Sequence, residues 1–491
     1  MRDNGVYDVI IIGAGTVGSC MARELSRYDI RLLLLEKGDD VCSGTSKATG
    51  AVIPGGFQLT PGTYETYLAL ASYPLYERMF RELDVRFREI ATLLVAFTPE
   101  EKTRLRDEFY LDCFKNGTLD VEWLGRDELL AIEPMLNPDV IAGIHAPRNY
   151  IFSPFDWVIG LTENAVANGV ELVCSAEVLG ISPIQGGVRT VSTRLADFRG
   201  RWIVNTAGLY CDEIARMVGI DDFVVTPRKG QCAILDNGAA YRLRTMLAPV
   251  PTGDLATGRG VCIRPTVYGN LLLGGTHDEQ LDKEDKDVTA EGLHGLFRDA
   301  RRLLPALREK DVIHCHAGLR AVRHPEGVHI DRYPAVNGFI CISGVRSTGF
   351  MVSPAIAVTV REMLVDAGLP MHRRKDFQPV RKRPVCFSEQ PTEVQQQLVR
   401  DNPDYGEVIC RCETVTKAEI LQAIRGMPPA WSLDAIKRRV SPGMGRCQGG
   451  HCGPRIARIL AEELGVPLEQ VTLRGVNSNL VLGALKAPCD E

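Results

Sequence analysis

Four cysteines near the C-terminal end of the chain have the spacing of a metal-binding site. Cys410 and Cys412 form a C-x-C pair, and Cys447 and Cys452 form a C-x4-C pair after a helical pattern. Four thiolates supply two ligands to each iron of a [2Fe–2S] cluster, and glycines around Cys447 let backbone N–H groups turn toward the sulfurs. Four thiolates also satisfy structural zinc, but zinc sites more often use C-x2-C pairs. The spacing therefore predicts an iron–sulfur centre, with zinc as the competing interpretation.

A second group of residues, near the N-terminus, has the pattern of a dinucleotide site. The apolar run 8–12 predicts a buried parallel strand, and a glycine-rich turn and a helical pattern follow it. Gly13 permits the tight turn, Gly15 lets the backbone approach a pyrophosphate, and Gly18 allows close packing of helix on strand. Glu36 ends the next apolar run and can accept hydrogen bonds from ribose hydroxyls. We therefore predict a βαβ unit whose helix N-terminus binds phosphates.

The stretch after this unit favours FAD over NAD. Residues 42–56 (CSGTSKATGAVIPGG) are small, polar and glycine-rich, where a plain NAD domain would have a third βα unit. Such a loop suits the close approach of backbone to a large planar ligand. Strand patterns at 202–208 and 339–344 end in small residues and extend the same domain. The inserted residues from about 226 to 333 contain short strand-like runs and predict a mainly antiparallel substrate domain.

Composition places the chain among ordinary globular proteins. Its 491 residues are 45% hydrophobic and 24% charged, which predicts two or three domains with sizeable cores. A net charge of −5 gives no reason to expect nucleic acid or an anionic membrane as partner. No uninterrupted apolar stretch is long enough for a membrane span. Most of the fifteen cysteines lie in apolar context, so we expect a reducing, cytoplasmic compartment. The N-terminus runs almost directly into a strand pattern, and we expect no secretory signal before it.

The motifs occur in an order found in one flavoenzyme superfamily. The N-terminal fingerprint is followed by GTSKATGAVIPGG, NTAGLYCDEIARMVG, PRKGQ, RPTVYGNLLLGGT, HAGLR and GVRSTGFMVSPAIA. In this order they resemble the D-amino-acid oxidase-like superfamily and, within it, the branch of anaerobic glycerol-3-phosphate dehydrogenases and L-2-hydroxyglutarate oxidases. Residues 408–460 resemble the bacterioferritin-associated-ferredoxin-like domain that ends those dehydrogenases. The resemblance covers nearly the whole chain.

The resemblance implies a fold class and a domain order. The fold is α/β, with a FAD-binding Rossmann-like domain, an inserted antiparallel substrate domain and a small helical [2Fe–2S] domain. The oxidoreductase part spans 1–370, with FAD-binding segments at about 1–90, 150–225 and 334–370 and substrate segments at about 91–149 and 226–333. An exposed basic linker at 371–407, the [2Fe–2S] domain at 408–460 and a tail at 461–491 complete the chain.

The resemblance also implies the residues that bind the cofactors. The four cysteines named above match the ligands of a [2Fe–2S] cluster. The positions expected at FAD are Gly13, Gly15, Val17, Gly18, Glu36, Lys37, Thr45, Ser46, Val178, Ala207, Gly208, Gly344, Thr348, Gly349 and Phe350.

Three arginines are candidates for binding an anionic substrate. Arg320, in HAGLR, matches the family arginine that holds a carboxylate or phosphate, and its bidentate fork suits such an anion. Arg346 and Arg264 could add further anion contacts. If all three face the flavin, a doubly anionic substrate is favoured: a phosphate ester, a dicarboxylate or an opine-like compound. For each arginine the alternative is a structural ion pair.

One departure from the family pattern concerns the proton of the substrate. Pro54 stands where many members carry a histidine near the flavin. Alcohol oxidation needs a base for the hydroxyl proton, whereas a neutral amine can give up hydride without one. His316, His277 and Tyr268 are the replacement candidates, with a hydrogen-bonded packing role as the alternative for each.

These features predict a FAD-dependent dehydrogenase. We expect it to oxidise a small anionic hydroxy compound, of the glycerol 3-phosphate or 2-hydroxyglutarate type, to the ketone. Electrons would pass from flavin to the cluster and on to additional redox subunits. Oxidation of an amino acid or secondary amine of the opine or proline type is the second hypothesis, and an electron-transfer subunit is the third. Peripheral contact with the inner membrane through a partner is the alternative to a purely cytoplasmic location.

Overall fold

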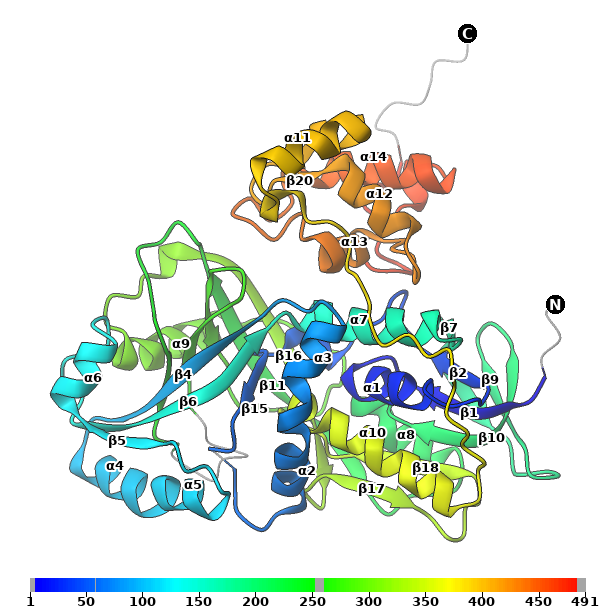
Figure 1. Ribbon diagram of the computed structural model, residues 1–491, viewed down its shortest axis with the longest axis horizontal. Coiled ribbons are helices and arrows are strands. Elements are labelled where there is room, and N and C mark those ends of the chain that lie inside the picture. Colours follow the sequence, from blue (N-terminus) through cyan, green and yellow to red (C-terminus); the bar gives the residue numbers. More distant parts are fainter. Residues whose placement is uncertain (1–4, 58, 252–259, 484–491) are drawn as a thin grey trace.

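The computed structural model describes residues 5–57, 59–251 and 260–483, which form three units (Figure 1). A nucleotide-binding domain surrounds one mostly parallel sheet, and a second domain surrounds a larger, mostly antiparallel sheet. A small helical domain stands above both in Figure 1. Within these ranges, every helix is too short or too polar to cross a membrane. The α/β fold class predicted from the sequence is confirmed.

The first sheet has the order β17–β18–β10–β1–β2–β7. All of these strands run parallel except β17, which pairs antiparallel with β18. Alternate residues of β1 face opposite sides, and both sides are buried: Val9 and Ile11 contact one core, Ile10 and Ile12 another. The strands are β1 (Tyr7–Ile12), β2 (Leu32–Leu35), β7 (Glu171–Val173), β10 (Asp197–Asn205), β17 (His329–Arg332) and β18 (Phe339–Ser343), with the antiparallel extension β8 (Val178–Ile181) and β9 (Arg189–Thr193).

Helices cover both faces of this sheet, which explains the continuous apolar runs in its strands. The helices α1, α7 and α10 pack together on one face, and α8 packs on the other. Their bounds are α1 (Thr16–Leu25), α7 (Pro154–Ala167), α8 (Cys211–Arg216) and α10 (Gly349–Asp366); α2 (Tyr64–Ser72) and α3 (Tyr76–Glu82) lie beside them.

The second sheet has the order β15–β11–β14–β13–β12–β4–β6–β3, with β16 paired to β11 and β5 to β6. The long antiparallel pair β11–β16 places Arg228 opposite Arg320 and Cys232 opposite His316. The strands are β3 (Val52–Pro54), β4 (Phe87–Ala96), β5 (Glu122–Gly125), β6 (Ala142–Phe152), β11 (Val224–Leu235), β12 (Met246–Pro249), β13 (Cys262–Pro265), β14 (Leu271–Gly274), β15 (Asp278–Glu279) and β16 (Val312–His324). The helices of this domain are α4 (Pro99–Arg104), α5 (Leu111–Lys115), α6 (Arg126–Ile132) and α9 (Ala290–Leu303).

Two strands cross the domain boundaries expected from the sequence. β3 lies in the segment assigned to the FAD domain, yet it pairs with β6 of the second sheet. β17 lies in the segment assigned to the substrate domain, yet it pairs with β18 of the first sheet. Both strands are short and sit where the chain passes between domains, so their pairing is decided by neighbouring strands rather than by local pattern.

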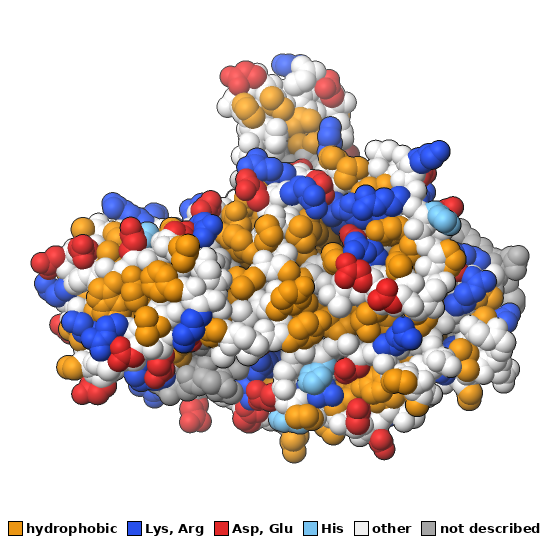
Figure 2. Space-filling model, turned by 60° about the horizontal axis from the view of Figure 1, so that its bottom comes forward, with side chains coloured by type: hydrophobic (Ala, Val, Ile, Leu, Met, Phe, Trp, Pro, Cys, Tyr) orange, Lys and Arg blue, Asp and Glu red, His pale blue; other side chains and the backbone are white. Residues whose placement is uncertain are grey.

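The segment predicted as an exposed basic linker is in large part fastened to the nucleotide-binding domain. Arg381 is buried, and its guanidinium lies 2.5 Å from Glu163 and 3.1 Å from the carbonyl of Leu83. Asn168 donates to the carbonyl of Gln378 at 2.9 Å. The prediction was wrong for these residues because their positive charges meet carboxylates and carbonyls on helices distant in sequence. Lys and Arg side chains do gather on the surface beneath the C-terminal domain in Figure 2.

The C-terminal domain is a compact set of short helices around its own apolar core. Thr416 caps α12 by accepting from the backbone N–H of Glu419, whose carboxylate returns to the N–H of Thr416. α13 faces α7 of the nucleotide-binding domain (Figure 1). The elements are α11 (Thr392–Asp401), β19 (Val408–Cys410), β20 (Val415–Thr416), α12 (Lys417–Arg425), α13 (Leu433–Val440) and α14 (Gly453–Leu464).

Candidate active site and cluster site

The glycines of the N-terminal fingerprint have the positions that a dinucleotide turn requires. Gly13 has a φ of +102°, and a Cβ there would lie 2.8 Å from the carbonyl oxygen of Thr206. A Cβ on Gly18 would lie 1.9 Å from the carbonyl oxygen of Gly13, so only glycine lets α1 pack this closely on the turn. Gly15 is the N-cap of α1 and contributes no capping side chain. Gly15, Thr16 and Val17 line the cavity, so the N-terminus of α1 lies at its wall.

Glu36 shapes the turn at the end of β2. One carboxylate oxygen accepts from the N–H of Ala14 and the other from the N–H of Gly38, both at 2.8 Å. Burial raises the pKa of Glu36, and these two amide donors oppose that rise. Ser46 accepts from the N–H of Thr16 at 3.0 Å, which joins the glycine-rich loop to the start of α1. The loop and the fingerprint thus form one continuous surface.

A cavity of about 670 Å³ runs from this surface to the antiparallel sheet. Its size and its mainly apolar walls with a few polar groups fit a large cofactor plus a small substrate. Gly18 and Thr348 lie behind the wall: Gly18 packs on the turn, and the hydroxyl of Thr348 donates to Glu65. The other thirteen positions expected at FAD line the cavity: Gly13, Gly15, Val17, Glu36, Lys37, Thr45, Ser46, Val178, Ala207, Gly208, Gly344, Gly349 and Phe350.

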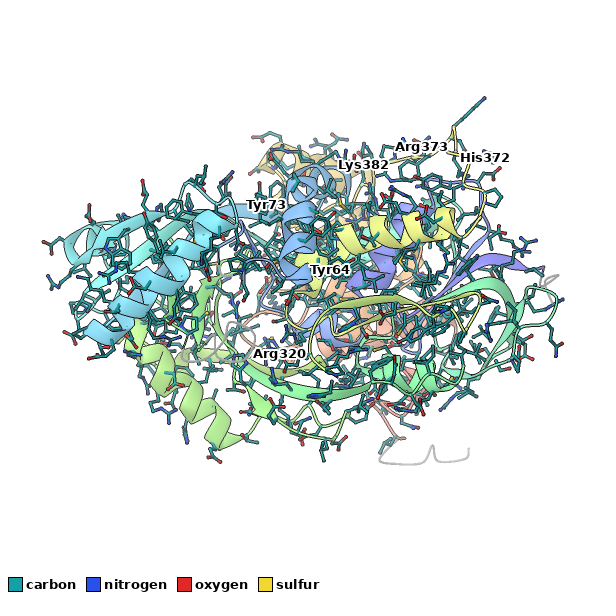
Figure 3. All side chains as sticks on the ribbon, turned by 90° about the horizontal axis from the view of Figure 1, so that it is seen from below. Tyr64, Tyr73, Arg320, His372, Arg373 and Lys382 are labelled. Atoms are coloured by element: carbon teal, nitrogen blue, oxygen red, sulfur yellow. The ribbon has the colours of Figure 1, made fainter. Side chains whose placement is uncertain are left out.

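Two of the predicted arginines converge on one backbone segment of the cavity. Arg320, on β16, donates to the carbonyl of Thr276 at 2.9 Å, and Arg264, on β13, donates to the carbonyl of Gly274 at 3.0 Å. A Cβ on Gly230 would lie 2.6 Å from Arg320, and a Cβ on Gly50 would lie 2.3 Å from Arg264. Glycine at both places leaves room for the guanidinium groups. Figure 3 shows Arg320 near the centre of the molecule.

Arg346 also lines the cavity, but its charge is compensated within the protein. Its guanidinium lies 3.0 Å from Glu65 and 3.0 Å from Glu326, and the side chain is 8% exposed. This arrangement favours the structural alternative for Arg346 over an anion contact.

The three candidate bases have different surroundings. Pro54 and His277 both line the cavity. His316 lies behind the wall, where its ring stacks on His314 with centroids 5.6 Å apart, and burial lowers its pKa to about 4. Tyr268 also lies away from the cavity: its hydroxyl is 2.7 Å from that of Ser153, and burial raises its pKa. The structure therefore brings His277 to the site but not His316 or Tyr268.

The four cysteines of the C-terminal domain lie in two pairs. The sulfurs of Cys412 and Cys447 are 3.8 Å apart at the surface, and Cys410 and Cys452 form a buried hydrogen-bonded pair. The Cys452 thiol and backbone N–H groups, including that of Gly443, lower the pKa of Cys410 to about 5. Backbone N–H groups likewise lower the pKa of Cys447.

This paired arrangement fits an iron–sulfur cluster better than zinc. Two separate pairs match the need of a [2Fe–2S] cluster for two thiolates on each iron. The amide donors around Cys410 and Cys447 would stabilise its negative charge.

Sequence reasoning missed several residues of the site. Cys232 is one of the cysteines in apolar context, and it is buried, yet it lines the cavity. Burial raises its pKa, and Arg264 and Arg320 oppose that rise. Thr92 of β4 lines the same cavity. Alternation along these strands was the available signal, but it could not tell which face of the sheet meets the FAD domain.

Comparisons with known proteins agree with this geometry. Residues 8–363 match the FAD dependent oxidoreductase family, and residues 408–462 match the BFD-like [2Fe–2S] binding domain. The chain is 34% identical over 482 residues to a glycerol 3-phosphate dehydrogenase of Caloramator mitchellensis, covering 98% of this chain and 99% of the relative. It is 23% identical to one subunit of the anaerobic glycerol-3-phosphate dehydrogenase of Haemophilus influenzae, covering 95% of this chain and 86% of that relative.

A solved structure shows the same fold. The FAD-bound L-alpha-glycerophosphate oxidase of Mycoplasma pneumoniae superposes with a TM-score of 0.74 at 27% identity, covering 78% of this chain and all of that one. The predicted resemblance and both predicted cofactors are confirmed. The chain therefore belongs to the FAD dependent oxidoreductase family, with FAD and a [2Fe–2S] cluster as its cofactors.

Proposed function

We propose that this chain is a dehydrogenase that oxidises glycerol 3-phosphate, or a closely similar anionic hydroxy compound, to the ketone. The observation that carries the proposal is the convergence of Arg264 and Arg320 on the segment 274–276 inside the cavity. The relatives named for glycerol 3-phosphate support the choice of substrate.

The two arginines suit a phosphate monoester. At neutral pH this group carries close to two negative charges, and guanidinium forks bind its oxygens through charge-assisted hydrogen bonds. Arg264 and Arg320 lie on β13 and β16, on either side of β11 and β14, so rigid strands hold them. Such a site would fix the phosphate end of the substrate and leave its hydroxyl-bearing carbon to be oriented against the flavin.

Oxidation of the alcohol removes a hydride equivalent from carbon and a proton from oxygen. The flavin, when bound, supplies the hydride-accepting chemistry. We propose that the imidazole of His277 accepts this proton; His277 lines the cavity two residues beyond Gly275. A histidine there can act as the base that Pro54 does not provide.

Presence of the cluster on the same chain supports an acceptor other than dioxygen. A [2Fe–2S] centre exchanges one electron at a time, which suits delivery to a further redox subunit. Exposure of Cys412 and Cys447 would leave one edge of the cluster open to such a partner. We place the chain in the cytoplasm, with peripheral attachment to the inner membrane through that partner as the alternative.

A second candidate function is oxidation of an amino acid or secondary amine. Pro54 in the cavity wall favours it, because a neutral amine can give up hydride without a base. An electron-transfer subunit without its own substrate is the third candidate, and the two converging arginines argue against it.

Anaerobic stopped-flow spectroscopy of the cluster-intact protein separates the three candidates. Flavin absorbance is followed while glycerol 3-phosphate, L-2-hydroxyglutarate, glycine, proline and an opine are each added. Rapid bleaching by glycerol 3-phosphate that is lost in Arg320→Ala supports the proposal. Bleaching by amines alone, or by none of the compounds, would refute it in favour of the second or third candidate.

A further inference from the structure

A group of buried charges joins the C-terminal domain to the nucleotide-binding domain. Arg439 of α13 binds both carboxylate oxygens of Asp40, at 2.7 and 2.9 Å, and Arg438 binds one of them at 2.8 Å. All three side chains are 3% exposed or less. Burial alone would raise the pKa of Asp40, but the two arginines lower it to about 2. This geometry fixes how the two domains meet, and removing one partner while the domains stay docked would leave a buried charge uncompensated.

Asp40 belongs to the loop that also carries nucleotide-site residues. Glu36 precedes it by four residues, and Thr45 and Ser46 follow it. A second ion pair from the same loop, between Lys47 and Asp434 of α13, measures 3.4 Å. Loop 36–47 is therefore fastened to the C-terminal domain at two points.

The C-terminal domain also reaches the cavity itself. Asp434 and Arg474 line it together with Gly13 and Gly15 of the fingerprint. A Cβ on Gly475 would lie 3.0 Å from the Cβ of Asp39, so the chain after α14 packs directly on loop 36–47. The loop thus has the nucleotide cavity on one side and the C-terminal domain on the other.

We propose that the C-terminal domain is part of the FAD-binding site. By docking on loop 36–47 through Asp40 and Asp434, it holds that loop in the shape that binds FAD and slows FAD release. The inference rests on FAD as the cofactor and is independent of the substrate. Because coupling between two binding equilibria is reciprocal, the factor by which docking raises the affinity for FAD is also the factor by which bound FAD strengthens docking.

The test uses the FAD-loaded, cluster-intact protein and the variant Asp40→Asn, which removes the charge and keeps the size of the side chain. FAD release is followed as the rise in flavin fluorescence after dilution. We expect release about tenfold faster than in the wild type. With an unchanged association rate this is about a tenfold lower affinity for FAD, within the range usual for coupled sites. Asp434→Asn should give a smaller acceleration, because Asp434 is 23% exposed and its pair with Lys47 is longer.

Asp156→Asn is the matched control. Asp156 is a buried carboxylate of the same domain that binds Arg86 at 2.6 and 2.9 Å, and it lies on α7 rather than in loop 36–47. We expect this variant to unfold at a lower temperature but to release FAD at the wild-type rate. Unchanged FAD release in Asp40→Asn, or equal acceleration in Asp156→Asn, would overturn the proposal.

Limited proteolysis of the segment 371–407 provides the reciprocal measurement. In the wild type, FAD should slow cleavage of this segment; in Asp40→Asn the protection by FAD should be reduced. Equal protection by FAD in both proteins would contradict the coupling. Neither measurement uses a substrate. The outcome for FAD binding is therefore independent of whether the proposed substrate is right.

Discussion

The guanidinium of Arg346 lies 3.0 Å from the carboxylate of Glu65, and this contact joins the loop before α10 to helix α2. Glu326 adds a second carboxylate at 3.0 Å. The hydrogen bonds of Arg264 and Arg320 described above go to backbone carbonyls instead. Three arginines of similar appearance in the sequence therefore stand in two electrostatic environments, and they should respond differently to mutation.

Arg264→Ala should lower kcat/KM for the anionic substrate on the order of 30-fold, because a charge-assisted hydrogen bond to the anion is lost. This corresponds to roughly 2 kcal/mol of transition-state stabilisation. Arg346→Gln should change KM by no more than about threefold but should lower the melting temperature, because Glu65 loses its cation and Glu326 keeps only Arg228, at 3.4 Å. Steady-state kinetics and thermal unfolding check both. A larger rise in KM for Arg346→Gln than for Arg264→Ala would show instead that Arg346 binds the substrate and that Arg264 is structural.

His277→Asn should lower kcat by about a hundredfold if the substrate is an alcohol, because general-base catalysis is worth that order of rate. Its residual rate should rise with pH as hydroxide replaces the missing base. His316→Asn is the control, since His316 lies behind the cavity wall. Wild-type kcat in His277→Asn would rule out His277 as the base and favour an amine substrate.

Stability should fall on mild acidification because of His316, whose pKa is lowered from 6.5 to about 4. Above pH 6.5 the ring is neutral in both the folded and the unfolded chain. Between pH 6.5 and 4 the unfolded chain binds a proton that the folded chain does not, so unfolding becomes easier. The loss at pH 5 should be on the order of 1 kcal/mol, since His316 is only partly buried and water weakens the effect.

Urea unfolding at pH 7 and pH 5 measures this effect, and His316→Gln should remove most of the difference. The Asp40 contribution falls in a separate window: its pKa is lowered from 3.8 to about 2, so its stabilisation is lost only as the pH drops below 3.8. An unchanged pH dependence in His316→Gln would show that other groups cause the loss.

Cys412→Ser should abolish the electron paramagnetic resonance signal of the reduced cluster and lower the iron content below two atoms per chain, because one iron loses a thiolate. Flavin bleaching by substrate should continue. Cys386→Ser is the matched control, since Cys386 lies outside the two cysteine pairs. Zinc in place of iron in the wild-type protein would refute the cluster assignment.

Local patterns in the sequence were sufficient to predict the cofactor sites. Gly13, Gly15 and Gly18 occupy a turn that few other residues can form, so their spacing reports backbone geometry directly. Cys410 lies close to Cys412 in the sequence, and Cys447 lies close to Cys452, within one short domain. This spacing limits what the four thiolates can bind. The burial of the parallel strands on both faces could likewise be predicted, because their sequences are continuous apolar runs.

Tertiary structure decided what the sequence left open. Arg346 pairs with two carboxylates of the protein, whereas Arg264 and Arg320 donate to backbone carbonyls of the segment 274–276. These partners are distant in the chain or lie on other strands, so the sequence could not show which arginines are placed to bind a substrate anion. Arg438 and Arg439 likewise pair with the distant Asp40, and this pairing buries their charges between two domains. Side-chain chemistry can be read from a sequence, but the electrostatic partner that sets its role is chosen by the packing of distant elements.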